Sequence, residues 1–346
     1  CIVIHMAKKT AAILGATGFT GVELLRLIAQ HPEMDVVYAS GDSQAGEKLS
    51  HLYPSLRAAY PNMVAQEFSQ KAVSGVDVVF LGLPHESSVE IVPQLLGDVG
   101  CVVDLSAAFR LRDTAQYPQW YGFTHEHPEY VAQAVYGLPE IYRKELAGAQ
   151  LIATPGCYVT AATLALRPFV RGGIFHPEGL IVDAASGVSG AGKALKSSSM
   201  FASVDEDFSA YGLVSHRHTP EMEQEIGGQV LFTPHLAPMS RGILATCYAR
   251  PISANTTTES LLQVLAETYK NEKFIVVGEE IPSTKSTQGT NAVHITARYD
   301  ARTGYAIVIA ALDNLTKGAS GGAVQSANVA LGLEESLGLS SVGVWP

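Results

Sequence analysis

Charged residues are scarce in this sequence, and acidic ones outnumber basic ones. Asp, Glu, Lys and Arg together make up 16% of its 346 residues, and the formal net charge is -10 at pH 7. An acidic balance argues against nucleic acid or an anionic membrane as a partner. A small anionic substrate would therefore need a local cluster of cationic side chains.

Long apolar runs are also absent. No stretch reaches the ~18 consecutive apolar residues of a membrane-spanning helix, so no membrane partner is expected. The segment Cys1–Met6 is too short for a signal peptide and lacks its flanks, and we take Met6 as the natural start. A chain of this length that is 47% hydrophobic predicts a globular protein of about two domains.

Cysteine is rare and widely spaced. The four cysteines, at positions 1, 101, 157 and 247, form no Cys-x-x-Cys pair. This spacing argues against a disulfide framework and against a zinc site, and no metal is expected. The same usage suits a reducing compartment, so we expect a cytoplasmic protein.

A glycine-rich turn follows the first apolar strand. The strand covers 10–14, the sequence Gly-Ala-Thr-Gly-Phe-Thr-Gly covers 15–21, and a helix is predicted over 22–30. Strand, glycine turn and helix are the context of a dinucleotide-binding fingerprint, although the G-x-x-G-x-x-G spacing also occurs in ordinary turns. The residues expected to contact the cofactor here are Gly15, Thr17, Gly18, Phe19 and Thr20.

The next strand favours NADP(H) over NAD(H). An NAD enzyme usually ends this strand with an acidic residue on the ribose 2′-hydroxyl. Here the strand over 35–40 ends at Ser40, with Ser43 and Lys48 beyond it. Hydroxyls and a cation suit a 2′-phosphate, whereas Asp42 is the argument for NAD.

Further strands over 76–81 and 100–105 alternate with helical segments. This rhythm predicts a doubly wound parallel sheet, whose ligands lie at the carboxyl ends of the strands. Pro84 and Arg110 fall at such ends, and an arginine there suits an anion. The stretch 111–150 is expected to be irregular.

Cys157 is the candidate nucleophile. It follows Pro155-Gly156 and precedes an apolar run that predicts a buried helix. A helix N-terminus favours negative charge and hence a reactive thiolate. Taken alone, Cys157 would more often be a small core residue at a helix start.

A histidine cluster supplies a partner for that thiol. His216 and His218 flank Arg217, and Thr219-Pro220 predicts a helix start with Thr219 as N-cap and Pro220 at the first helical position. Either histidine is a candidate proton shuttle, and spacing does not choose between them.

The fold class that these segments predict is α/β. We expect a Rossmann-type NADP-binding domain over 7–155, joined by a C-terminal helix over 322–346. A catalytic and dimerisation domain of α+β type, with a mixed open sheet, is expected over 156–321. Its second glycine turn, around Ser186 and Gly187, and the junction residue Asn314 are expected near the cofactor.

Together these pieces resemble the N-acetyl-gamma-glutamyl-phosphate reductases of arginine biosynthesis, which are relatives of the aspartate-semialdehyde dehydrogenases. The resemblance runs from Ala11 to about Leu333. The motifs that carry it are GATGFTG (15–21), TPGCY (154–158), SGVSGAGK (186–193), HRHTPE (216–221) and NLTKGA (314–319). One departure is Ala108, where such enzymes typically carry Asp, and it leaves the substrate contacts open.

The resemblance implies a mechanism. The Cys157 thiolate attacks an acyl phosphate, phosphate leaves, and NADPH reduces the thioester to an aldehyde, with His218 as acid/base. The residues that it implies around the substrate are Ser106, Arg110, Tyr158, Lys193, His216, Arg217 and Glu221, with the Tyr158 N–H as an oxyanion donor. Family members form dimers or tetramers. The alternatives are a reductase of aspartyl or aminoadipyl phosphate, and a non-catalytic NADP-binding redox regulator.

Overall fold

A computed structural model describes residues 7–345, so the expected start at Met6 lies outside the described residues. The chain divides into two compact units. The first comprises the described residues up to Arg112, then Glu126–Thr154 and Ser320–Leu339. The second comprises Asp113–His125, Pro155–Ala319 and the chain from Ser340 onward. The expected first domain, 7–155, contained 113–125, a stretch that belongs to the second unit.

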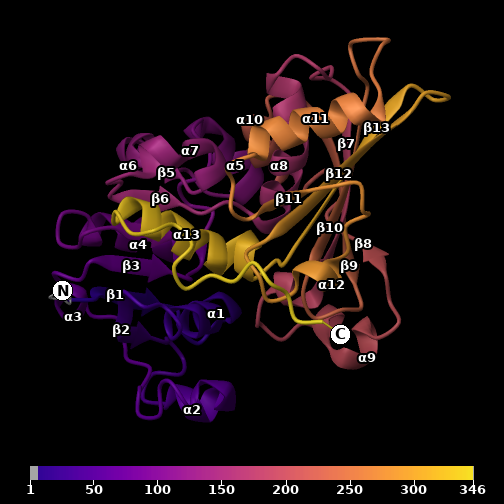
Figure 1. Ribbon diagram of the computed structural model, residues 1–346. Coiled ribbons are helices and arrows are strands. Elements are labelled where there is room, and N and C mark those ends of the chain that lie inside the picture. The colour runs from indigo at the N-terminus through magenta and orange to yellow at the C-terminus, as the bar shows by residue number, and fades with distance from the viewer. Residues whose placement is uncertain (1–6, 346) are drawn as a thin grey trace, which may run out of the picture. The chain divides into compact units, whose positions relative to one another are not determined.

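The first unit is built on a six-stranded sheet, drawn in indigo and magenta in Figure 1. Its strand pairs are all parallel. In spatial order the strands are β2 (Met34–Ser40), β1 (Lys9–Leu14), β3 (Val78–Leu81), β4 (Val102–Asp104), β6 (Leu151–Ala153) and β5 (Val135–Tyr136). The predicted doubly wound parallel sheet is therefore confirmed.

Both faces of this sheet are buried, because odd- and even-numbered strand residues are both apolar. In β1, Ala11 and Ile13 pack into one core, with helices α1 (Phe19–Ile28) and α13 (Gly321–Ala330). Ala12 and Leu14 pack into a second core on the other face, with α4 (His85–Leu95). A strand buried on both faces needs a continuous apolar run, and residues 11–14 are all apolar.

Two stretches of the first half differ from expectation. The stretch 111–150 is not irregular, because short helices whose first turns hold prolines occupy it, and the strand β5 lies between them. The C-terminal helix ends at Ala330 rather than continuing to 346, since Gly332 has a left-handed φ of +70°. The short helices of the chain up to residue 150 are α2 (Leu49–Leu52), η1 (Pro54–Leu56), α3 (Gln70–Val73), η2 (Thr114–Gln116), α5 (Tyr117–Tyr121), α6 (Pro128–Gln133) and α7 (Pro139–Leu146).

The glycine turn after β1 brings helix and strand into close contact. Gly15 has φ +83°, and a Cβ there would lie 2.4 Å from the Gly82 carbonyl oxygen. A Cβ on Gly21 would lie 2.3 Å from the Gly15 carbonyl oxygen. Glycine is therefore needed at both positions, as a dinucleotide-binding turn requires.

The second unit is built on a seven-stranded mixed sheet. Parallel pairs β11–β12 and β7–β9 occur beside antiparallel ones, so the expected mixed sheet is confirmed. In spatial order the strands are β11 (Ile275–Val277), β12 (Val293–Asp300), β13 (Tyr305–Leu312), β10 (Ile243–Ala249), β7 (Leu180–Gly187), β9 (Val230–Ala237) and β8 (Ser209–Ala210).

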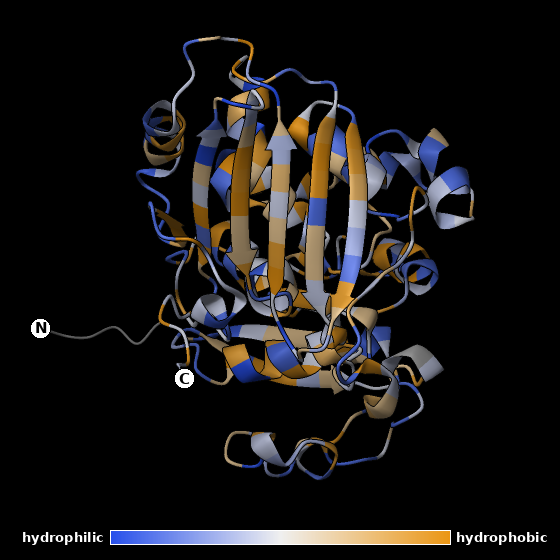
Figure 2. Ribbon diagram, turned by 90° about the vertical axis from the view of Figure 1, so that its right-hand side faces the viewer, coloured by the Kyte–Doolittle hydropathy of each residue, from blue (hydrophilic) through white to orange (hydrophobic). Residues whose placement is uncertain are grey.

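Helices cover one face of this sheet. The helices α8 (Cys157–Arg171), α10 (Thr219–Ile226) and α11 (Thr258–Tyr269) contact its strands. Figure 2 shows the long strands from the other face, over which no helix lies in that view. On that face Ile181, Tyr248 and Ile307 stand in one register row and are half-buried. The remaining short helices are η3 (Val188–Ala191), η4 (Ser197–Ser199), α9 (Phe201–Val204), α12 (Thr284–Thr287) and the π-helix η5 (Thr316–Ser320).

No helix within residues 7–345 combines the length and the hydropathy that a membrane-spanning segment requires.

Replacement of Gly21 by alanine tests the close packing of the first turn. The new Cβ would lie 2.3 Å from Gly15 O and 2.5 Å from Ala16 Cα, both backbone atoms that cannot move freely. We expect the free energy of unfolding to fall by about 1–3 kcal/mol, measured by urea unfolding. Gly18→Ala is the control, because its Cβ would meet only Gly15 O, at 3.5 Å. Equal midpoints for the two variants would contradict the packing argument.

Candidate active site

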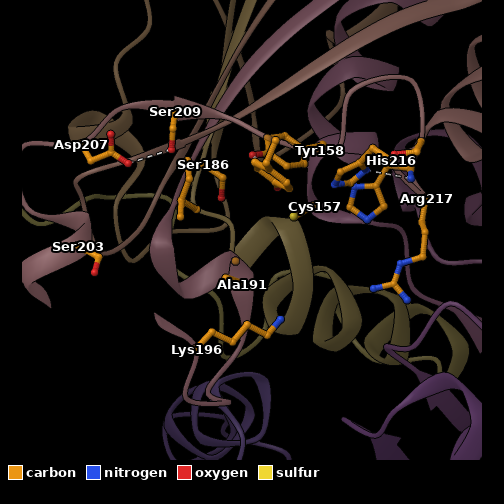
Figure 3. A pocket seen from close by; sticks show the side chains of 16 residues that line it. Cys157, Tyr158, Ser186, Ala191, Lys196, Ser203, Asp207, Ser209, His216 and Arg217 are labelled. Atoms are coloured by element: carbon orange, nitrogen blue, oxygen red, sulfur yellow. Dashed lines mark hydrogen bonds between the residues drawn. The ribbon is translucent and has the colours of Figure 1, made fainter. Parts of the chain in front are cut away.

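A cavity of about 550 Å³ surrounds Cys157, and all its lining residues belong to the second unit. Figure 3 shows it from close by. The lining residues are Cys157, Tyr158, Ser186, Gly190, Ala191, Lys196, Ser203, Asp207, Ser209, Tyr211, Gly212, Ser215, His216, Arg217, His218 and Leu236. The structure thus brings together Cys157, both candidate histidines and Ser186, which lie far apart in the sequence.

Cys157 is the first residue of α8, as the sequence predicted. Gly156 is the N-cap, and its N–H donates to the Glu221 carboxylate oxygen Oε1 at 3.0 Å. Glu221 is fully buried. No side chain caps the helix, and no acidic residue lies in its first turn. The partial positive charge of this helix start therefore stabilises negative charge on the Cys157 sulfur.

His218 lies against the turn that precedes Cys157. A Cβ on Gly156 would lie 2.5 Å from His218 Nε2 and 2.7 Å from its Cδ2. Only glycine at 156 therefore leaves room for the imidazole. His218 itself is the N-cap of α10, which begins at Thr219, so the prediction of Thr219 as N-cap was one residue late.

His216 is held in one tautomer. Its Nδ1 accepts the backbone N–H of His218 at 3.1 Å, so the neutral ring carries its proton on Nε2. Burial, together with the smaller effect of the nearby Arg217 charge, lowers the pKa of His216 to about 4. His216 is therefore neutral at physiological pH and presents an N–H donor.

Tyr158 forms the aromatic wall behind the histidines. Its ring makes edge contacts with those of His216 and His218. Its hydroxyl donates to the His235 carbonyl at 2.8 Å and accepts from Tyr211 at 3.3 Å. Burial raises the pKa of both phenols, that of Tyr211 to about 12, so both stay protonated and hold the wall in place.

The cations of the cavity differ from those expected. Arg217 lines it, with its guanidinium 5.8 Å from the Tyr121 ring centroid. Lys193 is exposed and is not among the lining residues, whereas Lys196 is. The sequence offers two lysines after the second glycine turn and no pattern that chooses between them, which is why Lys196 was missed.

The second glycine turn is held by hydrogen bonds and close contacts with the segment before β10 and the segment after β13. Asn314 accepts the Gly242 N–H at 2.7 Å and donates to the Ser189 hydroxyl at 2.9 Å. A Cβ on Gly187 would lie 2.7 Å from the Arg241 nitrogen. Asn314 therefore positions the turn through these hydrogen bonds. Of the cofactor residues expected in this unit, Ser186 lines the cavity, and Gly187 and Asn314 do not.

One further glycine lies behind the sulfur-bearing residue. A Cβ on Gly318, in the π-helix η5, would lie 2.9 Å from the Cys157 Cβ. The motif NLTKGA (314–319) contains Gly318, but the sequence singled out only Asn314 in this segment.

The other expected site residues lie in the first unit. The Gly15 N–H donates to the Ser40 hydroxyl at 3.3 Å, at the ends of β1 and β2. Gly18 caps α1 without a side-chain bond, and no acidic residue lies in the first turn of that helix. This arrangement fits a pyrophosphate, since the start of α1 lies at the switch between β1 and β3 and favours negative charge. Thr17, Phe19 and Thr20 belong to the same turn and helix start, Ser43 follows β2, and Pro84 caps α4.

Ser106 and Arg110 are tied to the strand ends of the first unit. Ser106 donates to buried Asp104, whose pKa burial raises. Arg110 is buried and donates to the carbonyls of Thr154 and Leu105. Ala108 is fully buried in the apolar core. In this structure Arg110 therefore braces the ends of β4 and β6.

Two family models match the chain. The model described as "Semialdehyde dehydrogenase, NAD binding domain" matches residues 10–149. The model described as "Semialdehyde dehydrogenase, dimerisation domain" matches residues 157–314. The chain is accordingly an oxidoreductase that uses a nicotinamide cofactor.

Solved structures share the fold. Aspartate semialdehyde dehydrogenase II of Vibrio cholerae, complexed with ASA, superposes with a TM-score of 0.70 over 94% of this chain and 98% of that one, at 16% identity. The enzyme of Candida albicans with NADP gives 0.68 over 94% and 99%, at 17% identity.

Curated relatives are much more similar in sequence. The N-acetyl-gamma-glutamyl-phosphate reductase of Symbiobacterium thermophilum is 47% identical, over 96% of this chain and 98% of the relative. That of Jannaschia sp. is 46% identical, over 99% and 100%. With such identity over nearly its whole length, the chain belongs to the N-acetyl-gamma-glutamyl-phosphate reductase family.

Proposed function

We propose that this chain reduces N-acetyl-gamma-glutamyl phosphate to N-acetylglutamate 5-semialdehyde, with NADPH as reductant and release of phosphate, as a step of arginine biosynthesis. The observation that carries the proposal is the meeting of Cys157, at a helix start, with His218 in one cavity. The names of relatives at 42–47% identity support the substrate.

The first half-reaction is acyl transfer to sulfur. The Cys157 thiolate attacks the acyl carbon, the bond from that carbon to the phosphate oxygen breaks, and phosphate leaves to give a thioester. The backbone N–H groups at the start of α8, that of Tyr158 among them, suit the oxyanion of the tetrahedral intermediate. One helix terminus then serves both the nucleophile and the oxyanion.

His218 is the acid/base in this proposal. It accepts the thiol proton before the attack and returns a proton when the sulfur leaves the reduced intermediate. His216 does not suit this role, because its Nδ1 is occupied by a backbone N–H and its pKa lies near 4. As a neutral donor through Nε2, it is suited to hold a substrate oxygen. NADPH, when bound, supplies the hydride.

We assign the cofactor to the first unit, which includes the returning helix α13, and the acyl chemistry to the second unit. NADP(H) is favoured because β2 ends in Ser40, where an NAD enzyme would carry a carboxylate. Ser40 and Ser43 are the proposed partners of the 2′-phosphate.

The remaining assignments concern oligomeric state, compartment and partners. The uncovered sheet face of the second unit, with its half-buried apolar rows, suits pairing of two copies, and one matching family model is named for dimerisation. We propose a homodimer or homotetramer in the cytoplasm, without nucleic-acid or membrane partners, as the acidic charge suggests.

Replacement of Cys157 by alanine tests the nucleophile. We expect kcat to fall at least about a thousandfold, because no thioester forms, while the dissociation constant of NADPH stays within about twofold. Turnover is measured in the reverse direction with N-acetylglutamate semialdehyde, phosphate and NADP⁺. Faster turnover of aspartate semialdehyde by the unmodified chain would overturn the substrate, and full turnover by the variant would overturn the mechanism.

The two histidines are separated by His218→Asn and His216→Asn. We expect the first to lower kcat on the order of a hundredfold or more and the second far less, since only His218 transfers a proton.

His216→Asn also changes how the free energy of unfolding depends on pH. Because burial lowers the folded-state pKa of His216 below its unfolded value, unfolding takes up a proton, and the native chain loses stability as pH falls from about 6.5 to 4. The free energy of unfolding, measured in urea, should fall less in the variant than in the unmodified chain over that pH range. Parallel dependences on pH in the two proteins would refute the lowered pKa of His216.

Replacement of Ser43 by aspartate tests the cofactor. Ser43 is exposed, so the fold should tolerate the change, and the new carboxylate would repel a 2′-phosphate. We expect the KM for NADPH to rise on the order of tenfold, with that for NADH unchanged. Ser69→Asp, an exposed position of the same unit, is the control for added charge. If the unmodified chain used NADH as well as NADPH, the NADP assignment would fail.

A further inference from the structure

The cavity around Cys157 receives positive charge from two separate segments. Among the described residues that line it, Lys196 and Arg217 are the cationic side chains, and Asp207 is the carboxylate. Asp207 accepts a hydrogen bond from the Ser209 hydroxyl at 3.0 Å. His216 adds no charge near neutral pH. The cavity therefore offers two cationic positions to an anionic ligand.

Arg217 is the first of these cations. It stands between the two histidines, its carbonyl accepts the Tyr121 hydroxyl at 3.2 Å, and its guanidinium lies by the Tyr121 ring. A planar guanidinium in this position matches the two oxygens of a carboxylate.

Lys196 is the second of these cations. It lies between the second glycine turn and the 3-10 helix η4, and it is exposed. Figure 3 shows its side chain below Ala191; in that view Cys157 lies above Lys196, and Arg217 lies on the far side of Cys157. An ammonium on a flexible stem acts as a point charge that can follow a group as it moves.

This inference rests on the proposed function. The proposed substrate carries two anionic groups, a carboxylate and a phosphate, and its reactive carbon is next to the phosphate. We propose that Lys196 binds the phosphate group of the acyl phosphate, while Arg217 binds the carboxylate. When the Cys157 sulfur bonds to the acyl carbon, the carbon–oxygen bond breaks and the phosphate takes its electron pair. Lys196 then balances the charge that grows on the departing oxygen.

The test is the reverse reaction of Lys196→Gln, in which phosphate and aldehyde are separate substrates. We expect the KM for phosphate to rise on the order of 10- to 100-fold, as for loss of a charged hydrogen bond, with the KM for aldehyde within about twofold. Lys196→Arg should restore most of the affinity. Lys270→Gln is the charge control, because that exposed lysine pairs with Glu267.

A second measurement needs no organic substrate. Inorganic phosphate should slow alkylation of Cys157 by iodoacetamide in the unmodified chain and give little protection in Lys196→Gln. Because the ratio of rates with and without phosphate is compared, a general change in thiol reactivity cancels. This readout stands even if the substrate proves to be a different acyl phosphate, so the two proposals fail separately.

Three results would overturn the inference. One is an unchanged phosphate KM and full protection in Lys196→Gln. Another is a rise in the aldehyde KM instead, which would assign Lys196 to the carboxylate. The last is a phosphate effect in Lys193→Gln and none in Lys196→Gln, which would return the role to the lysine that the sequence suggested.

Discussion

The contact between Gly156 and the His218 imidazole is the constraint on which the rest of the site depends. The absence of a side chain at 156 lets the ring lie against the backbone just before Cys157. The same residue donates its N–H to buried Glu221, three residues after His218. The start of α8 and the start of α10 are thereby fixed to each other, and both candidate catalytic residues sit at helix termini.

Around this contact, the sheet of the second unit supplies position rather than chemistry. Strands β7 and β9 carry Ser186 and Leu236 to the cavity, and Tyr158 reaches back to the β9 carbonyl of His235. The aromatic wall made with His216 is uncharged at neutral pH. Fixed charge in the cavity is therefore confined to a few residues, whose effects are separable.

The sequence predicted those features that depend on local patterns. The glycine turn at 15–21, the parallel sheet and the helix start at Cys157 all follow from periodicity and turn chemistry. Distinguishing His216 from His218 required the structure, because the backbone bond to Nδ1 and the burial of the ring are tertiary properties. Lys196 was missed for the same reason, since only the path of the chain decides which lysine faces a cavity.

All residues that line the cavity with Cys157 belong to one of the two units, while the glycine turn suited to a dinucleotide belongs to the other. On the proposed mechanism, the chain therefore encodes two half-reactions in separate parts. Acylation of sulfur needs nothing from the nicotinamide, so protein without reductant would release one equivalent of phosphate and then stall as a thioester. Such a stalled thioester is an activated acyl group, and its lifetime depends on how well the second unit keeps water away from the sulfur.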